Sequence, residues 1–239
     1  MDIMRITFDA HEIIVPILPG DVSEKIWSAL QNGTYEAKEA FWVKRAVRPG
    51  DRILELGTGL GIIASVMAAT DDVRILAFDA NPEVVALARR VIDTNGFDNV
   101  TISHGLLMAG EPREVPFYVR KDFWMSSTFA DQGPYEHVIT IRSVEIDEII
   151  AAAGITILVM DIEGGEYELL RGAQLPGVER VFLELHDHLY GLDGVMQIIA
   201  AMAANGFAFD PRGSSGACAL FTRDLTPRAF DDAFALASV

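Results

Sequence analysis

Apolar and polar positions along this chain follow two spacings in turn. Short apolar runs between polar residues are typical of buried strands, and they lie at 52–57, 73–79, 99–104, 155–161 and 179–186. Between these runs, apolar residues recur every three to four positions, as in helices, at 60–69, 82–95, 144–153, 165–171 and 194–205. Strands that alternate with helices predict an α/β fold with a mostly parallel sheet.

An N-terminal cap precedes this alternation. Residues 5–17 alternate in the manner of a short hairpin, and 23–30 and 36–47 have helical spacing. We therefore expect residues 1–48 to form an N-terminal cap before the core.

A β insertion and a closing hairpin complete the pattern. The strand-like runs 115–120 and 137–142 are joined by the polar stretch 122–135, while 207–211 and 217–222 are expected to pair as a hairpin. At this length one domain over 1–239 is expected. Its parts are a core at 49–222, an insertion at about 112–142, and a tail at 223–239, where 226–239 are expected to form a loosely packed helix.

The most informative motif is the glycine loop between the first strand and the first helix of the core. It reads Glu55-Leu56-Gly57-Thr58-Gly59-Leu60-Gly61. Glycines allow a tight turn and let bare backbone approach a ligand. A dinucleotide motif would carry another glycine where this chain has Ile62, which argues against NAD. A glycine turn that binds no ligand is the alternative.

This loop resembles the first motif of the Rossmann-like S-adenosylmethionine-dependent methyltransferases. A carboxylate at Glu55 suits a donor that carries an ammonium and a sulfonium. Asp79 ends the next strand about 20 residues further on, where one carboxylate can accept two hydrogen bonds from a ribose. Asn81 fits the N-cap of the following helix, with Pro82 at its first position. The residues expected at the cofactor are Glu55, Gly57, Thr58, Gly59, Gly61, Asp79, Ala80, Asn81, Gly105, Leu106 and Asp161.

Acidic residues and histidines follow the last two parallel strands of the core. Asp161 and Glu163 come after the run 155–160, and His186 ends the run 179–186. Ligands of open α/β sheets lie at these carboxyl ends. Alternatively, Asp161 or Glu163 caps the helix that begins near Glu166.

These segments are similar to those of a narrower family, the FkbM-type methyltransferases. The matching stretches are Asp161-Ile162-Glu163-Gly164-Gly165-Glu166, Leu169-Leu170-Arg171-Gly172-Ala173 and Phe182-Leu183-Glu184-Leu185-His186, with further agreement at Asn81-Pro82, Ser126-Ser127-Thr128 and Ser143-Val144-Glu145-Ile146-Asp147. The similarity extends from about residue 34 to 186. Gly165 stands where the family usually has alanine, and Asp79 stands where a glutamate is expected.

The resemblance implies a class I methyltransferase fold: a mostly parallel seven-stranded sheet with an antiparallel C-terminal hairpin. It implies methyl transfer, usually to a hydroxyl oxygen of a sugar, a polyketide or another secondary metabolite. It also places Tyr35, Glu36, Ser126 and Ser127 near the acceptor, although these can equally be ordinary turn and cap residues.

Methyl transfer to an alcohol requires an oriented acceptor and a base. His186 is one candidate base, because imidazole titrates near neutral pH. Asp161 and Glu163 either orient it or act directly, and Asp161 ranks nearly equal to His186. A purely structural role for His186 is equally open. His188 is expected in the following loop.

Other readings of the same residues stay open. Asp161, Glu163, His186 and Asp187 can be read as a divalent cation site, but they lack tight ligand spacing and we expect no metal. An NAD-dependent oxidoreductase, a cofactor-binding module without catalysis, and N-methylation of an amino sugar are the alternatives to O-methylation.

Composition and charge narrow the partners. Nineteen basic and 35 acidic residues give a formal net charge of −16, which repels nucleic acid and anionic lipid. A small-molecule acceptor is therefore expected. The single cysteine, Cys218, excludes an internal disulfide and is expected to be a small buried apolar residue. The start Met1-Asp2-Ile3-Met4-Arg5 has no signal-peptide pattern, and no apolar stretch approaches the roughly 20 residues of a membrane span. We expect a soluble, cytoplasmic protein.

Overall fold

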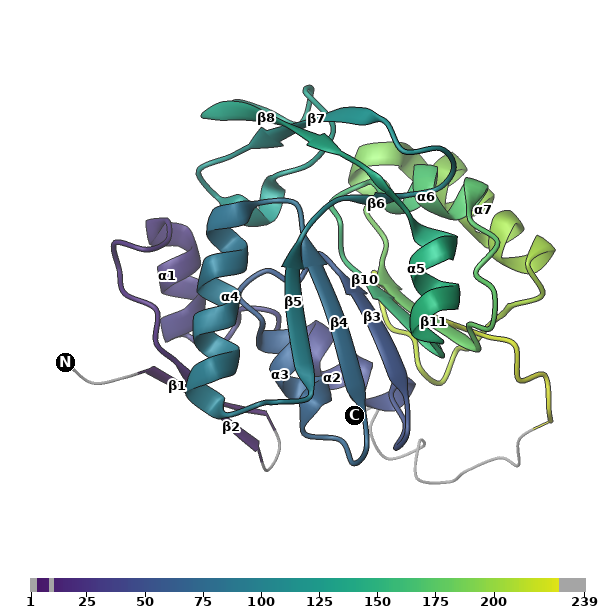
Figure 1. The fold of residues 1–239 in the computed structure, drawn as a ribbon, viewed down its shortest axis with the longest axis horizontal. Coiled ribbons are helices and arrows are strands. Elements are labelled where there is room, and N and C mark those ends of the chain that lie inside the picture. Colours follow the sequence, from purple (N-terminus) through teal and green to yellow (C-terminus); the bar gives the residue numbers. More distant parts are fainter. Residues whose placement is uncertain (1–3, 9–10, 228–239) are drawn as a thin grey trace.

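A seven-stranded sheet forms the centre of the computed structural model, which describes residues 4–8 and 11–227 (Figure 1). Its order is β12-β13-β11-β10-β3-β4-β5. The strands are β3 (Arg52–Leu56), β4 (Arg74–Asp79), β5 (Val100–His104), β10 (Ile157–Met160), β11 (Arg180–Glu184), β12 (Ala208–Phe209) and β13 (Cys218–Thr222). The first five are parallel, and β13 runs antiparallel to both β11 and β12. The expected fold class and closing hairpin are confirmed.

The strand order reverses next to β3. The chain runs from β3 outward through β4 to β5 and then returns to place β10 on the other side of β3. In open α/β sheets a ligand binds at such a switch point, beyond the carboxyl ends of the strands. The loops after β3 and β10 therefore meet where a site is expected.

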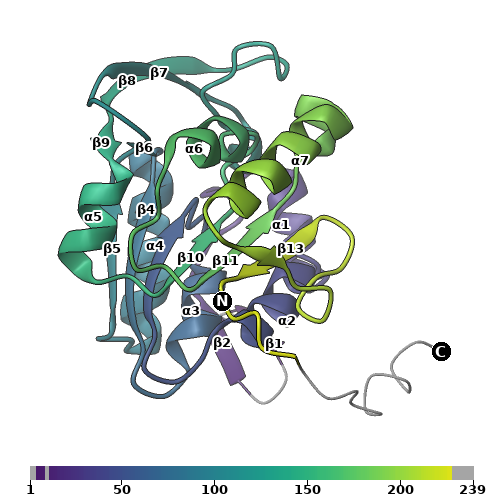
Figure 2. The same ribbon diagram turned by 90° about the vertical axis from the view of Figure 1, so that its right-hand side faces the viewer.

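Helices cover both faces of the sheet, because the central strands are apolar on both faces. One apolar cluster joins the sheet to α2 (Ala37–Ala46), α3 (Ile62–Ala68) and α4 (Pro82–Asn95), and the other joins it to α5 (Ile146–Ala153), α6 (Glu166–Gly172) and α7 (Asp187–Ala204). α6 and α7 lie side by side (Figure 2). Cys218 is buried in the first cluster, as expected.

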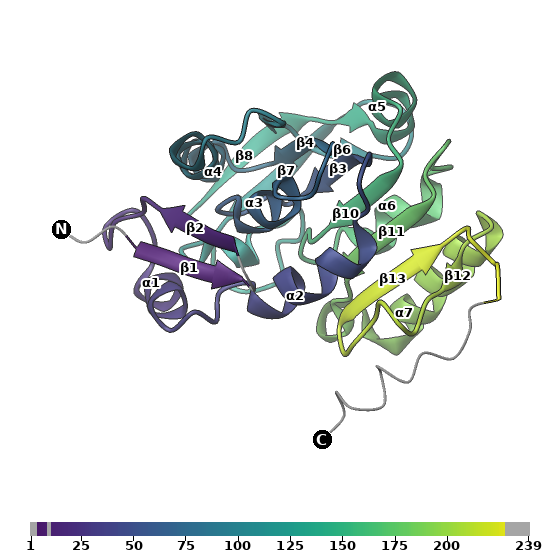
Figure 3. The same cartoon turned by 90° about the horizontal axis from the view of Figure 1, so that it is seen from below.

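The N-terminal segment packs on the α3–α4 face. β1 (Met4–Phe8) and β2 (His11–Val15) form the expected antiparallel hairpin, and α1 (Glu24–Gln31) lies beside it (Figure 3). Ser23 caps α1, because its side chain accepts a hydrogen bond from the amide of Ile26. Apolar residues of all three elements join the first cluster.

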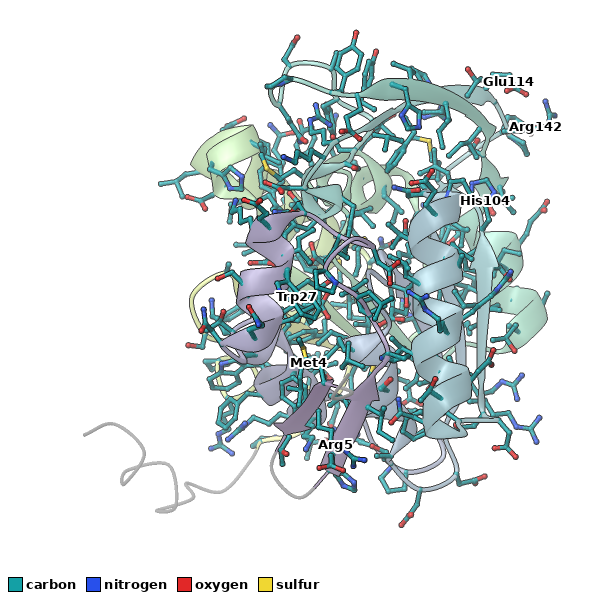
Figure 4. The ribbon with its side chains drawn as sticks, turned by 90° about the vertical axis from the view of Figure 1, so that its left-hand side faces the viewer. Met4, Arg5, Trp27, His104, Glu114 and Arg142 are labelled. Carbon is teal, nitrogen blue, oxygen red and sulfur yellow. The ribbon has the colours of Figure 1, made fainter. Side chains whose placement is uncertain are left out.

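The insertion forms a separate hairpin above the carboxyl ends of the sheet. β7 (Glu114–Val119) pairs antiparallel with β8 (His137–Arg142), and a short 3-10 helix at Phe123–Met125 lies between them (Figure 1). Glu114 and Arg142 face each other at one end of this hairpin, above His104 at the end of β5 (Figure 4).

Among the boundaries that differ from expectation, those around β9 (Val144–Glu145), α7 and β11 bear on the site. The helix expected at 144–153 begins at Ile146, because Val144–Glu145 forms β9 beside β6 (Leu107–Met108) and Glu145 then caps α5. The helix expected at 194–205 begins at Asp187 and is kinked at Gly191, so His188 lies in α7 and not in a loop. β11 ends at Glu184, before His186.

The ends of α4 agree with expectation. Asn81 accepts a hydrogen bond from the amide of Glu83, Pro82 is the first helical residue, and Gly96 ends the helix in a left-handed conformation. Of the tail expected as a helix at 226–239, residues 228–239 lie outside the described residues. Within the described ranges, no helix combines the length and apolar character needed to cross a bilayer.

Candidate active site

The glycine loop turns directly against the end of β10. Gly57 has a φ of 80°, and a Cβ placed there would lie 1.7 Å from the carbonyl oxygen of Asp161. Gly61 begins α3 with a φ of 77°, where a Cβ would lie 3.3 Å from the carbonyl oxygen of Ala88 in α4. The glycines therefore serve close backbone approach as well as the turn.

Glu55 lies behind this loop. Its side chain is buried, and its Oε2 accepts a hydrogen bond of 2.7 Å from the hydroxyl of Thr58. Burial raises the pKa of Glu55 to about 8, against the Thr58 hydrogen bond, and the charge of Asp79 adds to the rise. Glu55 and Thr58 stabilise the loop from behind and do not line the pocket in front of it.

Asp79 ties the glycine loop to the end of β4. Its Oδ2 accepts from the amide of Gly59 at 3.2 Å, and its Oδ1 accepts from the amide of Asn81 at 2.8 Å. Burial raises the pKa of Asp79 to about 6, although the amides of Asn81, Gly59 and Ala80 oppose the shift. The side chain of Asn81 accepts the capping hydrogen bond of α4 and does not line the pocket. Asp79 does line it, and is the polar side chain that this strand end offers to a ligand.

In front of the loop lies an opening that we call the donor pocket, with an empty volume of about 920 Å³ including its mouth. Expected site residues that line it are Tyr35, Glu36, Gly57, Gly59, Asp79, Ala80, Gly105, Leu106, Ser126, Asp161 and Glu163. Expected residues that do not line it are Glu55, Thr58, Gly61, Asn81, Ser127 and His186. The pocket also has an apolar wall that the sequence analysis missed, made by Phe78, Leu107, Met108, Phe117, Phe123 and Trp124.

Tyr35 and Glu36 reach the glycine loop from the N-terminal segment. A Cβ at Gly59 would lie 2.9 Å from both the Tyr35 hydroxyl and Glu36 Oε1. The Tyr35 hydroxyl and Glu36 Oε2 are buried without a hydrogen-bond partner among the described residues. Burial, together with the charge of Asp161, raises the pKa of Glu36 well above its usual value. The ring of Tyr35 stacks on Trp124, 6.0 Å between centroids.

The serines of the insertion hold its loop together. Ser126 Oγ accepts from the amide of Arg120 at 2.9 Å, and Ser127 Oγ donates to Gln132 Oε1 at 2.6 Å. Gln132 in turn donates to the carbonyl oxygen of Glu163 at 2.9 Å. The insertion is thereby joined to the acidic loop after β10.

The acidic loop after β10 is organised by Glu166. This fully buried carboxylate accepts from the amides of Ile162 and Gly164 at 2.9 and 3.0 Å. The cap position of α6 is Gly165 and has no side-chain hydrogen bond, so neither Asp161 nor Glu163 caps the helix. Both carboxylates line the donor pocket instead.

His186 lies among three carboxylates. Its Nε2 is 3.5 Å from Asp161 Oδ1 and 3.7 Å from Glu163 Oε2, and its Nδ1 is 3.3 Å from Glu166 Oε1. Burial by itself lowers the pKa of His186, but Glu166, then Asp161 and Glu163, outweigh it and raise the pKa to about 10. Burial raises the pKa of Glu163 to about 7 even though the charge of His186 opposes the shift.

A second cavity lies on the other side of Glu163, with an empty volume of about 700 Å³ including its mouth. Glu163 and Trp124 line both this cavity and the donor pocket. Of these two spaces, Glu184 and His186 line only the second. Asp161 and Glu163, after β10, and His186, after β11, thus form a partition between the donor pocket and the second cavity.

A family comparison agrees with this arrangement. Residues 57–209, nearly two thirds of the chain, match the model of the Methyltransferase FkbM domain. The chain belongs to this family. S-adenosylmethionine is accordingly its cofactor, and the resemblance drawn from the glycine loop and the Asp161–Glu166 block is confirmed.

Individual relatives of this FkbM-domain protein match shorter stretches. Ribosomal protein L11 methyltransferase of Chloroflexus aurantiacus is 33% identical over 93 residues, which are 38% of this chain and 26% of the relative. Protein-L-isoaspartate O-methyltransferase of Methanococcoides burtonii is 36% identical over 73 residues, 30% of this chain and 36% of the relative. The chain thus spans about a quarter to a third of the length of these curated relatives.

Solved structures resemble the FkbM domain at lower identity. Precorrin-6y C5,15-methyltransferase of Geobacter metallireducens has a TM-score of 0.48 at 12% identity, with 79% of this chain and 77% of that chain covered. Ribosomal protein L11 methylase of Lactobacillus delbrueckii also has a TM-score of 0.48, at 16% identity, with 80% and 78% covered.

The donor pocket of this FkbM domain fits S-adenosylmethionine in chemistry. Buried oxygens without partners among the described residues, at Tyr35, Glu36 and Asp161, lie near the glycine loop, and such groups are costly unless a ligand satisfies them. The carboxyl groups of Glu36 and Asp161 can pair with the ammonium and the sulfonium of the cofactor. The Phe78 and Leu106 side chains offer apolar surface for the adenine.

Proposed function

We propose that this protein transfers the methyl group of S-adenosylmethionine to a hydroxyl oxygen of a small molecule. The observation that carries the proposal is the shared position of Glu163, which lines both the donor pocket and the second cavity. A donor in one space and an acceptor in the other would meet beside this carboxylate. Holding the two reactants in that geometry is itself a large part of catalysis.

Several side chains would hold the cofactor, which when bound supplies an electrophilic methyl group on a sulfonium. Asp79 would accept hydrogen bonds from the ribose, as its position after β4 suggests. Glu36 and Asp161 offer carboxyl oxygens beside the glycine loop, which a bound ammonium or sulfonium would stabilise as carboxylates, while Glu55 and Thr58 keep that loop in place. Tyr35 and Glu36, expected at the acceptor, are better placed for the donor.

The acceptor proton would pass to Glu163. Glu163 and Asp161 line the donor pocket, whereas His186 lies beyond them and is only 4% exposed. Of these three groups, Glu163 alone lines both spaces, so its carboxylate would lie beside the donor and beside the acceptor oxygen. We assign Glu163 as the base and His186 as a positioning residue that holds Asp161 and Glu163 through its Nε2.

An amine acceptor is the second candidate. Glu163 and Glu184 line the second cavity together with Lys25, His186 and His188, and the two carboxylates offer acceptors to an amine as well as to a hydroxyl. Transfer to nitrogen would use the same donor pocket and would place less demand on the base.

An acceptor screen tests the proposal. Purified protein, S-adenosylmethionine and a panel of hydroxylated and aminated sugars would be incubated, and the methylated product identified by mass spectrometry. Glu114→Gln, at the exposed end of β7, serves as a control that should behave as wild type. Products methylated at oxygen would support the proposal, products methylated only at nitrogen would favour the second candidate, and cofactor binding without turnover on any acceptor would contradict both.

A further inference from the structure

Two carboxylates and one imidazole converge at the partition between the two cavities. One ligand atom each from Asp161, Glu163 and His186 lies within 4.8 Å of the others. Asp161 and Glu163 follow β10 and His186 follows β11, two parallel strands that are neighbours in the sheet. The three residues do not have the close spacing of metal ligands in the sequence. The pairing of β10 with β11 brings them together in the fold.

The separations are close to those of a coordination sphere. Two ligand atoms at right angles, each about 2.1 Å from a cation, are about 3 Å apart. Nε2 of His186 is 3.5 Å from Asp161 Oδ1 and 3.7 Å from Glu163 Oε2. Both distances exceed 3 Å by less than 1 Å, so small side-chain movements would bring Nε2 and each of these oxygens onto one ion.

The imidazole itself points to a ligand. The side chain of His186 is 5% exposed, and the buried Oδ1 of Asp161, 3.5 Å from its Nε2, has no hydrogen-bond partner among the described residues. Nδ1 lies 3.3 Å from the fully buried carboxylate of Glu166. Histidines that bind metals usually present the second nitrogen to a carboxylate in this way, which orients the ring. Here a bound cation would take the place of the Nε2 proton, between Nε2 and the oxygens of Asp161 and Glu163.

We propose that Asp161, Glu163 and His186 form a binding site for one divalent first-row cation at the partition between the donor pocket and the second cavity. A set of two carboxylates and one imidazole suits Mn²⁺ and its neighbours better than Ca²⁺, which takes oxygen ligands. With three protein ligands, positions remain open toward both cavities.

The role of this site rests on the proposed function, although its existence does not. An acceptor hydroxyl on the cation would lose its proton more easily. The O–H bond would break, the electron pair would stay on the acceptor oxygen, and the proton would pass to the oxygen of Glu163 that does not bind the cation. That acceptor oxygen would then form the bond to the methyl carbon as the bond from this carbon to the sulfonium sulfur breaks; its electron pair would stay on the sulfur, and S-adenosylhomocysteine would leave.

Titration with MnCl₂, followed by the electron paramagnetic resonance signal of free Mn²⁺, tests the site without any acceptor. We expect one saturable site per chain and at least about tenfold weaker binding in His186→Ala and Glu163→Gln. His137→Ala removes an exposed imidazole on β8 and should bind as wild type does. Thermal unfolding reports whether each variant is folded.

Three results would overturn the site: no saturable binding by the wild type, equal binding by wild type and Glu163→Gln, or equal losses in Glu163→Gln and His137→Ala. Glu163→Gln keeps the test decisive if His186→Ala does not fold, because the contact from Gln132 uses the backbone of Glu163. A parallel titration with S-adenosylhomocysteine separates the two proposals. Cofactor binding without Mn²⁺ binding would reject the metal site alone.

Discussion

The carbonyl oxygen of Asp161 occupies the space where a side chain at Gly57 would begin, with only 1.7 Å to an added Cβ. This contact joins the loop after β3 to the loop after β10 at the point where the strand order reverses. The two loops are consequently in close backbone contact, and the amide of Asp161 also donates a hydrogen bond of 3.0 Å to the carbonyl oxygen of Leu56. A change at Gly57 should therefore disturb both.

Gly57→Ala should destabilise the protein by more than about 3 kcal/mol, because it adds a backbone clash to a left-handed strain. Gly110→Ala is the matched control, since Gly110 has a φ of 84° and open space around its Cβ. That control should cost only about 1–2 kcal/mol. Urea unfolding of both variants measures the difference, and equal losses would show that the contact with Asp161 is unimportant.

Glu55 should make stability depend on pH. Its folded-state pKa is about 8 and its ordinary value is 4.5, so the folded state keeps a proton that the unfolded chain loses. This contribution is fully present below about pH 4.5 and is lost as pH rises toward 8. Relative to Glu55→Gln, the wild type should lose about 1.4 kcal/mol of unfolding free energy per pH unit in that window. Urea unfolding of the two proteins across this pH range measures the difference. If their unfolding free energies change with pH in the same way, Glu55 does not have a raised pKa in the folded state.

Asp79 should control cofactor affinity. Asp79→Asn removes an anionic acceptor for the ribose, and we expect about tenfold weaker binding of S-adenosylhomocysteine at pH 7.5. Asp93→Asn, on the exposed side of α4, is the control and should bind normally. Calorimetric titration measures both, and unchanged affinity in Asp79→Asn would remove Asp79 from the ribose role.

The same carboxylate predicts a pH dependence of binding. The pKa of Asp79 is about 6 in the protein without cofactor, and the ionised form is the better acceptor. Wild-type affinity should therefore fall as pH is lowered from 7 to 5, while the affinity of Asp79→Asn should change little. A wild-type affinity that rises as pH is lowered to 5 would contradict the role of ionised Asp79 in binding the cofactor.

Glu163→Gln should separate catalysis from binding. Loss of a general base lowers turnover by about 100-fold or more, whereas affinity for S-adenosylhomocysteine should stay within about twofold. Single-turnover methyl transfer on an acceptor found by the screen measures the first effect. Normal turnover in the variant would exclude Glu163 as the base.

The sequence predicts what local chemistry determines. The bounds of α4 follow from Asn81, Pro82 and Gly96 because capping depends on neighbouring residues. The parallel strands follow from apolar runs that only a sheet covered on both faces can bury. The glycine loop and Asp79 follow from spacing, because both belong to adjacent strand–loop units.

What the sequence does not predict depends on contacts between distant segments. Val144–Glu145 is a strand only because Leu107–Met108 lies beside it. Tyr35 meets Gly59 through the packing of the N-terminal segment. The surroundings of His186 come from residues that follow two different strands, so their combined effect on its pKa could not be anticipated.

The central claim is that this fold binds S-adenosylmethionine at the glycine loop. Calorimetric titration of the purified protein with S-adenosylhomocysteine, with NAD as the control ligand, tests it most directly. The account predicts binding of S-adenosylhomocysteine at one site in the micromolar range and no binding of NAD. A folded, ligand-free sample that binds NAD, or that fails to bind S-adenosylhomocysteine, would contradict it.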